Sequence, residues 1–90
     1  MKCAGPRTVT YVVASGEDRA PRFGFIVSKQ VGSAVTRNTV RRRLKAVCAQ
    51  SLSGVRPGAD VVIRARPSAA TADFADLATE VQRCLARRAA

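Results

Sequence analysis

Lysines and arginines are the residues whose number and spacing point most directly to a chemistry in this chain. Nine of them lie between Arg19 and Ala59, a segment with no aspartate or glutamate, and five fall between Arg37 and Lys45. Like charges one helical turn apart repel each other, so a small protein that keeps such a block needs an anionic partner. Nucleic acid is the commonest partner of this kind, and a merely solvated basic surface is the alternative.

Side chains that catalyse hydrolysis are scarce. The sequence has no histidine, which removes the usual general base and the commonest metal ligand. Asp73, Asp76 and Glu80 are spaced to share one helix face and could hold a hard cation. We favour a simpler interpretation, because acids in the first turns of a helix complement its dipole. No phosphate-binding loop or zinc-ligand spacing is present, so we expect no catalytic residue, metal site or cofactor site in the protein itself.

The composition is that of one small domain spanning residues 1–90. The net charge is +10, and 47% of the residues are hydrophobic, which is enough for a packed core. No apolar run approaches the roughly 20 residues that span a membrane, and the N-terminus lacks the apolar core of a secretion signal. Cys3, Cys48 and Cys84 are odd in number and widely spaced, so we expect reduced thiols in the cytoplasm.

Hydrophobic patterning predicts the order strand, strand, helix, strand, helix. Strands are expected over residues 7–13, 22–28 and 60–66, and the short first connection favours an antiparallel hairpin between the first two. One helix is expected to run from an N-cap at Ser33 to about residue 50, and a final helix to begin at an N-cap at Thr71. This order predicts an α+β fold, a two-layer sandwich of helices on a small mixed sheet.

The first of these helices places most of its charge on one side. At about 100° per residue, Val40, Leu44 and Val47 form a narrow apolar seam that must face the sheet. A contiguous polar arc lies beside the seam, called here the basic arc: Arg37, Asn38, Arg41, Arg42 and Lys45. Arg43 falls on the other flank of the helix, where we expect a solvated charge.

The basic arc has the composition of a phosphate-binding surface. Its arginines stand in the early turns of the helix, where the helix dipole disfavours cations, and such local conflicts are typical of functional sites. Guanidinium groups around an asparagine suit contacts with phosphates and sugars. The apolar seam is too narrow to pack a core and also enter a lipid surface, so we expect no membrane partner.

From Phe23 to Lys45 the sequence resembles the signature of the bacterial ribonuclease P protein component. In that family a strand ends in Ser-Lys, continues as Val/Ile-Gly-x-Ala-Val-x-Arg-Asn-Arg and enters a basic helix. The corresponding residues here run from Ser28-Lys29 to Arg37-Asn38-Thr39. A Val/Ile strand that ends in Arg-Pro at Pro67, and a last helix, extend the resemblance over about residues 7 to 88.

This resemblance implies an activity and a set of partners. The family fold contains a left-handed strand-helix-strand crossover, which the general preference for right-handed crossovers does not predict. Family members assist a large catalytic RNA, which uses bound magnesium to cleave the 5′ leader from precursor tRNA. The implied protein is therefore the cytoplasmic protein subunit of an endoribonuclease, with ribonuclease P RNA and precursor tRNA as partners and no obligate protein partner evident.

The family pattern also assigns roles to particular residues. The basic arc is implied to touch the catalytic RNA. Tyr11, Ser28 and Lys29 are implied to line the cleft that holds the single-stranded leader, with the tyrosine ring stacking on a base. From the residues alone, a tyrosine half-buried in the sheet is an equally good explanation of Tyr11.

Two departures from the family pattern affect these expectations. Thr39 stands where the family usually has arginine, which removes one guanidinium. The family also begins with a basic helix that forms one wall of the leader cleft, and that helix is expected to be absent here, through a start assigned too far downstream or a true truncation. We expect Val12, Val13, Phe23 or Phe25 to be partly uncovered as a result.

Two other functions remain open at the level of sequence. A structural RNA-binding protein of ribosomal type would use the same basic helix without any role in processing. A DNA-binding module would place that helix in a major groove. The second is disfavoured, because no turn-plus-helix pair precedes the basic helix and no dimer seam is evident.

Overall fold

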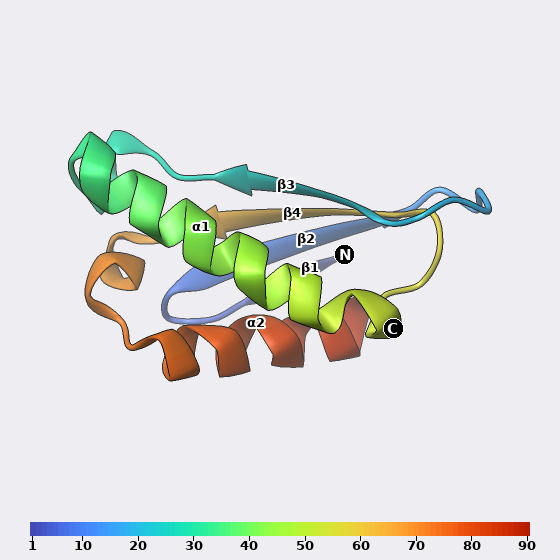
Figure 1. Ribbon diagram of the computed structural model, residues 1–90. Helices are drawn as coiled ribbons and strands as arrows, with labels where there is room; N and C mark the ends of the chain where they lie inside the picture. Colours follow the sequence, from blue (N-terminus) through green and yellow to red (C-terminus); the bar gives the residue numbers. More distant parts are fainter.

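The computed structural model describes residues 1–90 and contains four strands and two helices. The strands are β1 (Lys2–Ala4), β2 (Thr8–Ala14), β3 (Arg22–Ile26) and β4 (Ala59–Ala65). The helices are α1 (Ala34–Ser51) and α2 (Phe74–Arg88), and short 3-10 turns are η1 (Lys29–Val31), η2 (Leu52–Gly54) and η3 (Pro67–Thr71). Both helices cover the same face of the sheet, which confirms the two-layer α+β sandwich (Figure 1). Neither α1 nor α2 has the length and hydrophobicity of a membrane-spanning helix.

The four strands form one mixed sheet in the order β1-β2-β4-β3. Strand β4 is antiparallel to β2 and parallel to β3, and β1 adds antiparallel to the outer edge of β2. The expected hairpin between β2 and β3 is therefore wrong, because β4 lies between them. Its run Val61-Val62-Ile63 is continuously apolar, as is typical of a strand paired on both sides.

The connection from β3 through α1 to β4 is left-handed. The two strands are parallel neighbours, and α1 passes in front of the sheet between them in Figure 1. With both strands pointing upward and α1 toward the viewer, β4 lies to the left of β3, which is the reverse of the usual arrangement. The handedness implied by the family resemblance is confirmed.

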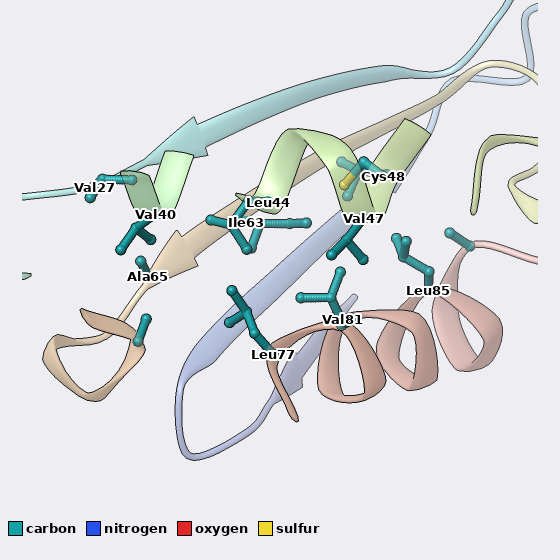
Figure 2. Packing of buried hydrophobic residues seen from close by; sticks show 14 of the residues in the cluster. Val27, Val40, Leu44, Val47, Cys48, Ile63, Ala65, Leu77, Val81 and Leu85 are labelled. Carbon is teal, nitrogen blue, oxygen red and sulfur yellow. The ribbon is translucent and has the colours of Figure 1, made fainter. Parts of the chain in front are cut away.

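The core fills the space between the sheet and the two helices (Figure 2). The predicted seam of α1 is confirmed: Val40, Leu44 and Val47 are at most 1% exposed. They share one cluster with Ile63 of β4 and Val81 of α2. Each buried aliphatic side chain of this size contributes about 1.5–3 kcal/mol. The core therefore fixes the rotation of α1 and directs its other side toward solvent.

The two helices begin differently. Ser33 caps α1 as predicted, because its hydroxyl accepts a hydrogen bond from the Thr36 amide at 3.3 Å. The predicted cap at Thr71 is wrong, since the N-cap of α2 is Asp73. Pro67 begins the 3-10 turn η3, which extends to Thr71 and delays the start of α2.

A disulfide joins Cys3 to Cys84, contrary to the expectation of three reduced thiols. Strand β1, which the sequence pattern did not predict, pairs Cys3 with Thr10 and so places it beneath α2, where Cys84 is fully buried. The two cysteines are 81 positions apart, a separation from which no pairing can be deduced. Cys48 is free and fills the core, as predicted.

Glu80 is buried beneath the turn between β1 and β2. Its carboxylate accepts hydrogen bonds from the Thr8 hydroxyl at 2.5 Å and from the Arg7 amide at 3.2 Å, and it pairs with the Arg7 guanidinium at 3.5 Å. A Cβ on Gly5 would lie 2.4 Å from the Glu80 Cδ atom, so this close approach requires glycine. Glu80 therefore holds the N-terminal turn against α2.

Candidate nucleic-acid interface

The basic arc of α1 faces outward because the opposite side of the helix is buried. All five of its residues are exposed or half-buried. None of them forms an ion pair: the protein has five ion pairs, and the cations in them are only Arg7, Arg19 and Arg22. The arc therefore presents its charge without a neutralising carboxylate.

Two arginines of the arc have unusual surroundings. The Arg41 guanidinium donates to the Asn38 side-chain oxygen one turn earlier, at 3.4 Å. The Nε atom of Arg37 is buried and has no hydrogen-bond partner. A buried donor without a partner costs about 1–3 kcal/mol, and an acceptor such as a phosphate oxygen would remove that cost.

The side chains of Arg43 and Thr39 both donate hydrogen bonds to backbone carbonyls of the protein. The Arg43 guanidinium donates to the Ala72 carbonyl at 3.3 Å, so the expected solvated charge is wrong. The flank of α1 that bears Arg43 faces the segment before α2, and the side chain is long enough to reach it. Thr39, where the family usually has arginine, donates its hydroxyl to the Val35 carbonyl of its own helix at 3.1 Å. Neither residue adds an outward donor to the arc.

A second group of cations gathers where the parallel strands β3 and β4 end. Ser28 and Lys29 follow β3, Arg64 lies near the end of β4 and Arg66 follows it, and all four line one pocket of about 580 Å³. The Nε atom of Arg66 is buried there without a partner. The structure thus places Ser28 and Lys29 at one pocket, adds two arginines that sequence reasoning missed, and leaves Tyr11, the third residue expected in the cleft, outside its lining. We call these four residues the strand-end pocket.

The sequence contained a signal for the missed arginines. Arg64 and Arg66 are two positions apart, so an extended chain directs both side chains to the same side. That spacing becomes informative only when β4 is known to lie beside β3, and the predicted hairpin hid this relationship.

Tyr11 lies on the face of the sheet that the helices leave uncovered, called here the open face. Val12 is 1% exposed beneath the helices, and because side chains alternate along a strand, Tyr11 points the other way. In the register of the sheet, Tyr11 stands between Lys2 of β1 and Val62 of β4, and Val62 stands beside Gly24 of β3. The tyrosine ring therefore has small or flexible neighbours and an accessible side.

The same alternation decides which apolar residues are uncovered. On the open face, Val13 is 63% exposed, as expected. The expectation is wrong for Val12, which the helices cover. Phe23 and Phe25 are half-buried against the core beneath α1, although they also border a shallow apolar groove beside Cys48.

At the starts of β3 and β4, the ends far from the strand-end pocket, the charges of acids and arginines neutralise each other. Asp60, near the start of β4, accepts hydrogen bonds from Arg19 at 3.0 Å and from Arg22 at 2.9 Å. The hydrogen bond from Arg22 holds the pKa of the Asp60 carboxyl below its ordinary value. Unpaired cations therefore concentrate at the other end of these strands, where the first turns of α1 also lie (Figure 1).

These features define a class of protein: a small basic α+β domain with cationic surfaces suited to nucleic acid. The Ribonuclease P family model matches residues 2–89, and the chain belongs to that family. The resemblance inferred from residues 23–45 is thereby confirmed.

Relatives with curated names agree with this assignment. The chain is 44% identical over 87 residues to the ribonuclease P protein component of Acidothermus cellulolyticus, an alignment that covers 96% of this chain and 72% of that protein. It is 61% identical over 62 residues to the Nocardia farcinica protein component, which covers 69% of this chain and 40% of that protein. The matched region is thus well under two thirds of the Nocardia relative.

Solved structures share the fold. The RNase P protein from Thermotoga maritima superimposes with a TM-score of 0.87 at 20% sequence identity, covering 100% of this chain and 84% of that one. The RNase P protein from Staphylococcus aureus gives a TM-score of 0.83 at 25% identity, covering 94% of this chain and 77% of that one.

Proposed function

We propose that this chain is the protein component of ribonuclease P. It binds the catalytic RNA of that enzyme and the 5′ leader of precursor tRNA, and it assists the endonucleolytic cut that gives the mature tRNA 5′ end. The main support is the basic arc, whose four cations have no ion-pair partner, on α1 of a chain that belongs to the ribonuclease P family.

The basic arc binds the catalytic RNA in this proposal. Guanidinium groups offer paired donors that match the oxygens of a phosphate, so Arg37, Arg41 and Arg42 bind the backbone and fix the position of the protein. Lys45 extends the contact along the helix, and Asn38 adds an amide that can donate or accept. Binding of this type depends on shape and charge and weakens strongly with salt.

The leader of precursor tRNA binds at the strand-end pocket and the open face. Lys29, Arg64 and Arg66 attract its phosphates, and the Ser28 hydroxyl offers one more donor. The Tyr11 ring stacks on a base, an interaction worth about 1–3 kcal/mol that tolerates any base sequence. The protein thereby increases the affinity for precursor over mature tRNA.

The hydrolytic chemistry is assigned to the RNA subunit. Magnesium prefers oxygen ligands, chiefly carboxylates, and no carboxylate lines the strand-end pocket. Four of the six carboxylates are held in ion pairs: Glu17, Asp60, Asp76 and Glu80. The residues present at the interface therefore do not fit a catalytic metal ion, and the magnesium of the reaction is bound by RNA. The protein acts in the cytoplasm without an obligate protein partner.

A cleavage assay tests this function. RNA-free protein should leave precursor tRNA intact, because no side chain at the interface can serve as a general base. Added to ribonuclease P RNA at low magnesium, the protein should accelerate leader removal, and an Arg37→Gln/Arg41→Gln variant should accelerate it less. Cleavage by the protein alone would contradict the proposal. Binding to the RNA without acceleration would instead indicate a structural RNA-binding protein of ribosomal type.

A further inference from the structure

The C-terminal end of α2 bears a group of cations that the proposed function does not use. Arg83, Arg87 and Arg88 of α2 are exposed. Arg56, from the segment before β4, reaches the same end of the helix, where its guanidinium donates to the Ala90 carbonyl at 3.1 Å. We call these four residues the α2 arginine cluster. None of them belongs to any of the ion pairs of the protein.

The helix dipole accounts for only part of this cluster. It favours cations in the last turn, which are Arg87 and Arg88. Arg83 lies before that turn and one turn from Arg87, a spacing at which like charges repel. Arg56 comes from a different segment of the chain. The cluster therefore has charge beyond what stabilises the end of a helix.

The acids of α2 lie near only one member of the cluster. Asp76 and Glu80 line a pocket together with Arg83, but both are already paired with Arg7, Asp76 at 3.9 Å and the buried Glu80 at 3.5 Å. Arg56, Arg87 and Arg88 have no carboxylate within ion-pair distance, so an external anion is the remaining source of neutralising charge for them.

The α2 arginine cluster is separate from the basic arc. In Figure 1 the first turns of α1 lie at the left, whereas α2 ends at the right. Arg43, through its bond to Ala72, marks the flank of α1 that faces α2, and the arc lies on the other flank. An RNA segment bound along the arc consequently leaves the cluster free.

We propose that the α2 arginine cluster is a second RNA-binding surface, which binds the phosphates of an RNA segment other than the one on the basic arc. Arginine forks match phosphate oxygens, so the surface recognises backbone and shape rather than base sequence. A lipid surface fits less well, because Leu77, Val81 and Leu85 on the apolar side of α2 are at most 3% exposed and cannot enter a membrane. The proposal rests on the proposed function, which supplies a large folded RNA with several segments.

Matched variants of the full chain test this surface. Arg83→Gln/Arg87→Gln/Arg88→Gln is compared with the arc variant Arg37→Gln/Arg41→Gln/Arg42→Gln in binding to transcribed ribonuclease P RNA, over roughly 50–200 mM salt. Affinity falls as salt rises, and each triple variant should make this dependence of log affinity on log salt less steep by about 2–3 units. Hydroxyl-radical footprints should lose protection at different nucleotides in the two variants.

Two controls separate RNA contact from folding. The corresponding triple arginine-to-lysine variant of α2 should keep the salt slope, and Gln82→Ala, an exposed neutral neighbour, should bind like the unaltered protein. If the triple glutamine variant melts at a lower temperature, Arg83→Gln alone still tests the surface, because Arg83 lies outside the last turn. That single variant should lose about one unit of slope.

The outcomes are distinct. An unchanged salt slope in the α2 variants, or loss of the same protections as in the arc variant, would overturn the second surface. Binding of the cluster to an acidic protein or to anionic vesicles, with the RNA footprint unchanged, would overturn it as well. Two separate footprints without acceleration of cleavage would contradict the proposed function and leave the second RNA surface standing.

Discussion

Arg43 donates a hydrogen bond to the Ala72 carbonyl, and this bond separates it from the two arginines that precede it in the chain. The Arg41 side chain donates a hydrogen bond to Asn38 of its own helix, and Arg42 is exposed. The three consecutive arginines therefore differ in their surroundings. Arg43 ties α1 to the segment before α2, whereas Arg41 and Arg42 belong to the surface proposed to bind RNA.

Replacing Arg43 should affect stability more than RNA binding. Arg43→Ala removes a hydrogen bond worth about 0.5–1.5 kcal/mol, so the free energy of unfolding in urea should fall by that amount. Arg41→Ala should leave stability nearly unchanged. It should also make the salt dependence of RNA binding less steep, by about one unit in the slope of log affinity against log salt. Both variants are compared at matched salt. Equal losses of RNA affinity would show that the assignment of the two helix flanks is mistaken.

Tyr11 should distinguish precursor from mature tRNA. Because its ring lies on the open face, Tyr11→Ala should weaken binding of the precursor by about 1–3 kcal/mol and leave mature tRNA unaffected, while Tyr11→Phe keeps the stacking surface. Val13→Ala, an exposed neighbour on the same face, is the control. The affinities of the assembled enzyme for both tRNAs are measured. A similar loss for both would indicate that Tyr11 has only a structural role.

Glu80 should be important for stability without affecting RNA contacts. Glu80→Ala leaves the buried Thr8 hydroxyl and the Arg7 amide without their acceptor, which should cost about 1–3 kcal/mol in urea unfolding. Asp76→Ala, which removes an exposed ion pair with Arg7, should cost no more than about 1 kcal/mol. Comparable effects of the two substitutions would contradict the buried role of Glu80.

The Cys3–Cys84 disulfide should make stability sensitive to reducing agents. Reduction should lower the free energy of unfolding by about 2–4 kcal/mol, since the bond constrains nearly the whole unfolded chain. Unfolding in urea with and without dithiothreitol measures this difference. Cys3→Ser should be destabilised to a similar extent and should no longer respond to the reductant. A reductant effect that persists in Cys3→Ser would contradict the bond.

Alkylation provides an independent check of the cysteines. Burial raises the pKa of the Cys48 thiol to about 12, so the folded protein should react very slowly at neutral pH. The unfolded, unreduced chain should accept one alkyl group, at its free Cys48. After reduction all three cysteines should react. Mass spectrometry counts the added groups.

Asp60 should make part of the stability depend on acid pH. The hydrogen bond from Arg22 holds the pKa of Asp60 below its ordinary value of 3.8. A carboxyl with a lowered pKa in the folded state stabilises the protein above pH 3.8, and this contribution disappears as the pH falls through the lowered pKa. Arg22→Ala should therefore destabilise the protein at about pH 7 and much less near pH 2. Urea unfolding at both values measures the effect, and equal effects would contradict it.

The helices were the most predictable part of this protein. The apolar seam of α1 and the cap at Ser33 depend on residues within a few positions of one another, and both are as expected. The position of β4 between β2 and β3 depends on contacts between distant segments, so a short connection wrongly favoured a hairpin. The disulfide was missed for the same reason, because Cys3 and Cys84 meet only after β1 and α2 have packed.

The parts of the candidate interface that lie on a single helix could be predicted from the sequence, whereas the parts that depend on the packing of distant segments could not. The exposure of the basic arc on one side of α1 follows from the 3.6-residue period of one helix. Arg64 and Arg66 join Ser28 and Lys29 only through the sheet order, which the local pattern does not contain. Arg43 lies on the flank that was expected, but its bond to Ala72 depends on the path of a segment 29 positions away.

The position of β4 has a consequence for the chain during its synthesis. Strand β3 pairs only with β4, so it remains without a partner until residues 59–65 have emerged from the ribosome. Contacts over such sequence separations form slowly, and an unpaired strand with Phe23 and Phe25 is prone to associate with other nascent chains. Residues 1–58, which precede β4, carry eleven lysines and arginines and only two acids, and this excess opposes that association through repulsion. The cations proposed to bind RNA in the finished protein thus also oppose association of the incomplete one.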